Sequence, residues 1–235
     1  MNAQRMETIL QGHAYPGRGI LLGRNADNTK AVVAYFIMGR SANSRNRVFE
    51  VTDDGIRTRA FDESKMEDPS LIIYHPVRKI DDGLIVTNGD QTDTIRDFML
   101  AGKTFAEGLR TRCYEPDPPN YTPRISGLLC ADGSYKLSIL KSADGDPSCN
   151  HRFFYEYDAP VAGTGHFIHT YPENLDPLPS FEGEPRRVIC DAPDAASFAD
   201  LLWANLNEDN KVSLYVSYID LATGEADTVI KNKNV

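Results

Sequence analysis

Short apolar segments separated by turn residues make up most of this 235-residue sequence and constrain its fold more than any other feature. Ten of these segments have the length and composition of β-strands. They span residues 19–24, 31–38, 47–52, 71–77, 84–87, 124–131, 135–141, 151–157, 165–171 and 211–219. The clearest hairpin joins 124–131 to 135–141 through Asp132-Gly133, a dipeptide typical of tight turns.

Two segments have helical periodicity instead. In 93–110, apolar residues recur at helical spacing, and Gly102 followed by the capping-box pattern Thr104-Phe-Ala-Glu107 predicts a break into two helices. A further helix is expected over 193–206, where Pro193 suits the first helical position. Many strands with few helices predict an α+β fold of two packed, mostly antiparallel sheets with these helices on their outer faces.

Chain length and composition narrow the class of protein. The sequence shows no repeat and no linker-like tract, so we expect one domain over residues 1–235. The longest apolar run, 31–38, is far shorter than the roughly 20 residues that cross a bilayer, and the first residues resemble no export signal. We therefore expect a cytoplasmic protein. The net charge of −9 argues against nucleic acid or an anionic membrane as a partner.

The charge is unevenly distributed along the chain. Residues 1–60 carry a net charge of +4, whereas residues 61–235 carry −13. An acidic protein that concentrates arginine in one segment either builds a pocket for a small anion or exposes a basic face to solvent. The charge count alone leaves both interpretations open.

Cysteine and histidine patterns favour no metal site. Neither the four cysteines nor the five histidines show metal-ligand spacing. The motifs typical of phosphate-binding loops, nucleophilic serines and zinc proteases do not occur either. We therefore expect neither a metal nor an organic cofactor.

Three polar segments follow predicted strands, and each carries side chains that suit a ligand. Guanidinium groups suit a phosphate because their planar forks donate two parallel hydrogen bonds, and a turn before a helix exposes backbone N–H groups. The segments are GRSANSRNR (39–47, with Arg40, Arg45 and Arg47), TNGDQTDTI (87–95, with Asn88 and Thr94) and CYEPDPPNYTPR (113–124, with Glu115 and Arg124). Taken singly, each segment is better interpreted as a turn with solvated charges than as a ligand site.

The order of these segments resembles a known family. GRGILLGRN (17–25), GRSANSRNR, then Tyr74, then NGDQTDTI and TPRI (122–125) occur in the order found in the archaeal-type IMP cyclohydrolases. The resemblance runs from about residue 15 to residue 130, and the pair of NGxxTDTI and TPRI is its specific part. Beyond Cys130 little more than the strand pattern matches, so the role of residues 131–235 is left open.

The resemblance implies a fold, a reaction and a catalytic set. The family has a four-layer α-β-β-α sandwich similar to N-terminal nucleophile hydrolases, and it closes the purine ring of a formamidoimidazole carboxamide ribonucleotide to give IMP. Its catalytic arginine, tyrosine and glutamate correspond to Arg47, Tyr74 and Glu115. Because segment 39–47 is about two residues longer than the family pattern, Arg45 stays an alternative to Arg47.

The implied mechanism assigns a role to each group. Glu115 is the base or orients the amide, Tyr74 donates to the formyl oxygen, and Arg47 makes that tyrosine more acidic. The candidates for phosphate, ribose and base contacts are Arg18, Arg40, Arg45, Asn88, Thr94 and Arg124. The expected ligand is a small purine ribonucleotide, and self-association into a homo-oligomer is left open.

Two other functions stay open at this point. An amidohydrolase of the same sandwich needs an N-terminal Cys, Ser or Thr, whereas removal of Met1 exposes Asn2 and the first cysteine is Cys113. A purine nucleotide-binding protein without catalysis would retain the pocket, and only turnover separates it from an enzyme.

Overall fold

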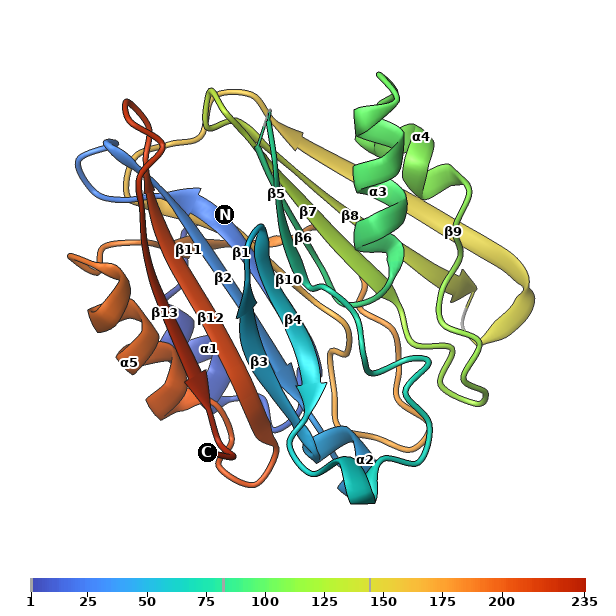
Figure 1. Cartoon of the computed structure of the whole chain (residues 1–235). Helices are drawn as coiled ribbons and strands as arrows, with labels where there is room; N and C mark the ends of the chain where they lie inside the picture. The colour runs from blue at the N-terminus through green and yellow to red at the C-terminus, as the bar shows by residue number, and fades with distance from the viewer. Residues whose placement is uncertain (1, 82, 144) are drawn as a thin grey trace.

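The computed structural model describes residues 2–81, 83–143 and 145–235, and it contains two antiparallel sheets (Figure 1). The strands of the first sheet are β1 (Arg18–Arg24), β2 (Lys30–Met38), β10 (Thr164–His169), β11 (Arg186–Ile189), β12 (Lys211–Asp220) and β13 (Ala226–Asn232). Those of the second are β3 (Arg47–Thr52), β4 (Gly55–Ala60), β5 (Val77–Ile80), β6 (Gly83–Thr87), β7 (Arg124–Cys130), β8 (Tyr135–Ala143) and β9 (Asp146–Tyr157). The spatial orders are β11-β10-β1-β2-β12-β13 and β3-β4-β5-β6-β7-β8-β9.

Helices lie beside each sheet. They are α1 (Met6–Gln11), α2 (Ala42–Arg45), the 3-10 helix η1 (Glu63–Lys65), α3 (Gln91–Leu100), α4 (Phe105–Arg110) and α5 (Ala195–Asn205). Helices α1 and α5 lie beside the six-stranded sheet, and α3 and α4 lie beside the seven-stranded one (Figure 1). None of the helices in the described ranges has the length and apolar character that crossing a bilayer requires.

The strands are apolar because their side chains are buried in three apolar clusters. One cluster joins the facing sides of the two sheets, with Ile20 and Val33 on one sheet and Val86 and Ile125 on the other. Two further clusters pack α1 and α5 on the six-stranded sheet and α3 and α4 on the seven-stranded sheet. Because successive strand residues point to opposite faces, a strand covered on both faces is apolar throughout, as in 31–38.

The structure confirms the α+β class, the two mostly antiparallel sheets and the expected helices. Gly133, at φ +76°, closes the β7–β8 hairpin, and Gly102, at φ +74°, separates α3 from α4. The Thr104 and Glu107 side chains form the predicted capping box. Helix α5 begins after Asp194, whose carboxylate accepts from the Ser197 amide, so Pro193 lies before the cap rather than at the first helical position.

The strand predicted over 71–77 is wrong. Only Val77 belongs to a strand, and residues 71–76 form an irregular segment. Proline at position 76 has no N–H to donate to a sheet ladder, so the strand begins only after it. Other elements were not predicted, because they are short or carry mixed polar sequences that lack a clear period. They are the strands β4, β11 and β13, the part of β5 after Val77, the helices α1 and α2, and the 3-10 helix η1.

Candidate active site

Strand ends bring three arginines to one end of the molecule. Arg18, Arg47 and Arg124 are the first residues of β1, β3 and β7. In the six-stranded sheet, Arg18 lies opposite Ile37 near the end of β2, and the chain then continues through α2 into Arg47. All three arginines are buried, at 8 %, 0 % and 5 % exposure.

Tyr74 reaches this end from the irregular segment before β5. Its amide donates to Thr58 Oγ1 over 2.8 Å, and its carbonyl accepts from the Thr58 amide over 2.9 Å, which ties the segment to β4. Its hydroxyl lies 2.8 Å from the Tyr35 hydroxyl of β2, so the pair joins the two sheets. Tyr74 is therefore positioned by backbone bonds on one sheet and by a side chain of the other.

Arg47 is wholly enclosed. Its Nε donates to the Ser44 carbonyl over 2.8 Å and its Nη2 donates to the Met38 carbonyl over 3.3 Å. The buried Nη1 has no partner among the described residues. Burial, and next the charge of Arg18, lower the pKa of Arg47. A cation in this position gains from a bound anion, because an anion would offset both effects.

The other arginines of segment 39–47, Arg40 before α2 and Arg45 at its last position, do not share the burial of Arg47. Arg45 is exposed, and its guanidinium donates to the Gly39 carbonyl and to Asn210 Oδ1. Arg40 is also exposed, donates to the Leu175 carbonyl over 2.9 Å, and lies over the ring of Tyr15. The segment expected to hold three anion-binding arginines thus contributes one of them to the buried end.

Glu115 is a buried acid whose environment changes its pKa. It is 2 % exposed, and its amide donates to the Thr122 carbonyl. Burial raises the pKa of the Glu115 carboxyl to about 7, even though the charges of Arg18, Arg124 and Arg47 act to lower it. Its buried Oε1 has no partner among the described residues. A carboxyl with a pKa near neutrality can accept or release a proton at physiological pH.

Arg124 is held by the start of α3. Its Nη1 lies 2.7 Å from both Gln91 Oε1 and Asp90 Oδ1, and its buried Nε has no partner among the described residues. Gly89 packs against this pair so closely that a Cβ would lie 2.5 Å from Arg124 Nη1. Any larger residue at position 89 would therefore displace the Arg124 guanidinium or the Gln91 amide.

Asn88 and Thr94 were predicted to contact the substrate, but their side chains bond to protein atoms. The Asn88 amide donates to the Pro123 carbonyl and its Oδ1 accepts from the Ile125 amide, so this side chain joins the end of β6 to the start of β7. Thr94 lies one turn into α3, where its hydroxyl accepts from Arg112 over 3.4 Å. Both side chains support neighbouring segments.

We call Arg18, Arg47, Tyr74, Glu115 and Arg124 the buried polar cluster. The electrostatic influence of Arg18 reaches both Glu115 and Tyr74, and so does that of Arg47, which means that the acid and the phenol share one environment. Four buried atoms of the cluster lack partners among the described residues: Arg18 Nε, Arg47 Nη1, Glu115 Oε1 and Arg124 Nε. Unpaired buried donors and a lone acceptor are the complement of a polar, anionic ligand.

Several neighbours of this cluster were not predicted from the sequence. Tyr35 lies within the apolar run 31–38, which was predicted only as a strand, and its hydroxyl contacts that of Tyr74. Tyr171 follows β10, and its buried hydroxyl lies 2.7 Å from Thr122 Oγ1. Gln91 was inside a quoted motif, but nothing in the pattern distinguished it from the other turn residues. A tyrosine inside an otherwise aliphatic strand was the one available indication for Tyr35.

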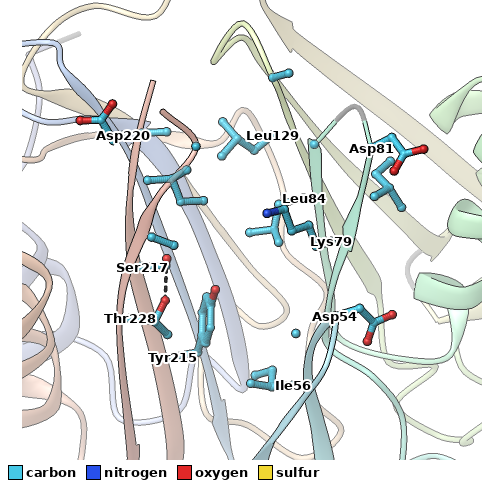
Figure 2. Close-up of a pocket in the computed structure, with 18 of the residues that line it drawn as sticks. Asp54, Ile56, Lys79, Asp81, Leu84, Leu129, Tyr215, Ser217, Asp220 and Thr228 are labelled. Atoms are coloured by element: carbon cyan, nitrogen blue, oxygen red, sulfur yellow. Dashed lines mark hydrogen bonds between the residues drawn. The ribbon is translucent and has the colours of Figure 1, made fainter. Parts of the chain in front are cut away.

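A cavity of about 830 Å³ lies at the opposite ends of the strands (Figure 2). It is bounded by the β3–β4, β5–β6 and β12–β13 turns, with Ile56, Leu84 and Leu129 facing Tyr215. No member of the buried polar cluster lines it. In the part of the chain that the structure describes, no group of three or more His, Cys, Asp or Glu residues is arranged to hold a metal ion.

Known proteins resemble this chain over most of its length. A family model described as IMP cyclohydrolase-like protein matches residues 15–225. An IMP cyclohydrolase of Methanopyrus kandleri is 30% identical over 182 residues, which cover 72% of this chain and 89% of that protein. The IMP cyclohydrolase of Methanococcus maripaludis strain C7 is 35% identical over 126 residues, covering 52% of this chain and 61% of the relative. That of Methanosphaera stadtmanae is 32% identical over 130 residues, covering 54% and 63%.

The matched lengths differ among these relatives. The chain spans most of the Methanopyrus protein but less than two thirds of the other two relatives. The family match also continues well beyond residue 130, where the motif resemblance stopped. Strands β10, β11 and β12 therefore belong to the matched region.

Proposed function

Because this chain belongs to the IMP cyclohydrolase-like protein family, we propose that it is an IMP cyclohydrolase that closes the ring of a formamidoimidazole carboxamide ribonucleotide. The observation that carries the proposal is the buried polar cluster, in which Tyr74 and Glu115 share the influence of Arg18 and Arg47. The reaction needs an acid, a base and an anion-binding environment, and the cluster contains one candidate for each.

Substrate binding is assigned to the buried guanidinium groups. Among the described residues, no partner is found for the buried Nε of Arg18, the buried Nε of Arg124 or the buried Nη1 of Arg47. These donors suit the phosphate or the polar edge of the ring. Arg40, Arg45, Asn88 and Thr94 already bond to protein atoms, so we assign them to support of the site rather than to direct contact.

Glu115 is the proposed base and Tyr74 the proposed acid. The carboxamide nitrogen attacks the formyl carbon, its proton goes to Glu115, and the formyl oxygen takes the proton of Tyr74 as its double bond opens. The resulting hydroxyl then leaves as water with the proton from Glu115. The former formamide nitrogen returns its hydrogen to Tyr74, which restores both residues. Holding the two reacting groups in contact supplies much of the rate gain, since an amide nitrogen is a weak nucleophile.

Family membership also supports more specific proposals about the layers of the fold, the number of domains, the cellular location and the ligand. The helices beside the outer faces of two facing sheets support a four-layer α-β-β-α sandwich similar to N-terminal nucleophile hydrolases. A single domain, a cytoplasmic location and a small purine ribonucleotide as the ligand remain parts of this proposal. The proposed ring closure consists of proton transfers and the loss of water, and none of these steps uses a cofactor.

Assay of IMP formation tests the proposal. The purified protein should convert the formylated ribonucleotide to IMP, followed by mass spectrometry of the product. IMP binding without turnover would favour the non-catalytic nucleotide-binding alternative. Neither binding nor turnover would refute the proposed function. The amidohydrolase alternative lacks support from the buried polar cluster, which contains no Cys, Ser or Thr.

A further inference from the structure

Tyr35 is a polar side chain in an apolar place. It lies near the middle of β2, opposite Ile20 of β1 and Tyr215 of β12, and its side chain belongs to the core between the sheets. It is fully buried, and its ring stacks on Phe49 with centroids 5.7 Å apart. A buried hydroxyl costs stability unless it is bonded, so a phenylalanine would suit the packing better unless the hydroxyl has a task.

The hydroxyl of Tyr35 meets that of Tyr74 at 2.8 Å. Tyr35 is carried on an inner strand of the six-stranded sheet, whereas Tyr74 lies in an irregular segment beside the other sheet. The hydroxyl of Tyr35 is thus presented to Tyr74 from a strand that is paired on both sides. No other side chain bonded to the Tyr74 hydroxyl appears among the described residues.

By geometry either hydroxyl can be the donor of this hydrogen bond, and the environment of Tyr35 favours Tyr35 as the donor. Burial, and next the neighbouring Tyr74, raise the pKa of Tyr35, so Tyr35 keeps its proton throughout the working pH range. A phenol that stays protonated can donate to its partner when the partner becomes an anion. When Tyr35 donates, the proton of Tyr74 is free to point toward another acceptor.

We propose that Tyr35 is a positioning residue that donates its hydrogen bond to the Tyr74 oxygen, directs the Tyr74 proton toward the substrate oxygen, and stabilises the phenolate that remains. This inference rests on the proposed function, in which Tyr74 gives its proton to the formyl oxygen. The proton returns to Tyr74 at the end of the cycle, and Tyr35 itself neither gains nor loses one.

Tyr35→Phe removes the donor and preserves the ring. Its matched control is Tyr215→Phe, which removes a buried hydroxyl from the opposite position of the neighbouring strand, away from Tyr74. A hydrogen bond to a charged group is worth enough to change kcat by roughly 10- to 100-fold. We therefore expect that loss for Tyr35→Phe, with KM within about twofold, and near wild-type kcat for Tyr215→Phe.

The pH profile separates positioning from packing. Without the Tyr35 donor, Tyr74 releases its proton less readily, so the alkaline limb of kcat should move to higher pH. A lower kcat with an unmoved limb, or an unchanged kcat, would overturn the inference. Failure of the proposed function is distinguishable, because wild type would then show no turnover. In that case, NMR titration of ring-labelled Tyr74 with IMP bound decides: a higher titration point in Tyr35→Phe supports the inference, and an equal one overturns it.

Discussion

Replacing Glu115 by Gln tests whether the ionised carboxylate, which the proposed mechanism uses as a base, destabilises the folded protein. Glu115 is 2 % exposed, and burial raises its pKa from 4.5 to about 7, despite the opposing charges of Arg18 and Arg124. Each pKa unit is worth about 1.4 kcal/mol. Ionising Glu115 in the folded protein therefore costs about 3 kcal/mol more than ionising it in the unfolded chain.

The effect on stability has a defined sign and pH window. At pH values below 4.5, Glu115 is protonated in both states and its charge has no influence. Between 4.5 and about 7 the folded protein keeps a proton that the unfolded chain has lost, so wild-type stability falls as the pH rises. Above that window the full penalty applies. Glu115→Gln should therefore raise the free energy of unfolding at pH 8 by up to about 3 kcal/mol, or about 6–12 °C in Tm.

Two measurements on the same variant check this reasoning. Thermal unfolding without ligand at pH 4.5 and pH 8 should show stabilisation only at the higher pH, while kcat for IMP formation falls by about 10²–10⁴. Wild-type kcat/KM should decline as the pH falls through about 7, because the base must be ionised. Glu63→Gln, an exposed carboxyl in η1, should change neither stability nor rate. Loss of stability at pH 8 together with full activity would refute the role of Glu115.

The other residues give three further predictions. Tyr74→Phe should lower kcat by about 10²–10³ and leave IMP affinity within about twofold; a wild-type rate in steady-state assays would remove Tyr74 from the mechanism. Arg47→Ala should weaken IMP binding at least about tenfold in calorimetry, whereas the exposed Arg45→Ala should change it less than about twofold; equal losses would contradict the choice of Arg47. Asn88→Ala should lower the free energy of unfolding by about 2–4 kcal/mol in urea titrations, because its side chain makes buried hydrogen bonds on both sides; a loss below about 1 kcal/mol would contradict that role.

Local sequence was sufficient for features that depend on neighbouring residues. The β7–β8 hairpin follows from Asp132-Gly133, because a glycine tolerates the positive φ that the turn requires. The break between α3 and α4 follows from Gly102 and the Thr104 capping box in the same way. Segment 71–77 was mispredicted because its apolar composition resembles a strand, while Pro76 and the bonds of Tyr74 to Thr58 decide its path.

The residues of the site also fall into two groups, those that the sequence indicates and those that only the tertiary structure identifies. The order of motifs along the chain was enough to indicate Tyr74, Glu115 and an arginine of segment 39–47 as one functional set. Only the tertiary structure separates the buried Arg47 from the exposed Arg45, and only it brings Tyr35 to Tyr74 across 39 positions of sequence. Burial depends on the packing of two whole sheets. For that reason the raised pKa of Glu115 and the choice of its neighbours are properties of the folded chain and of no single segment.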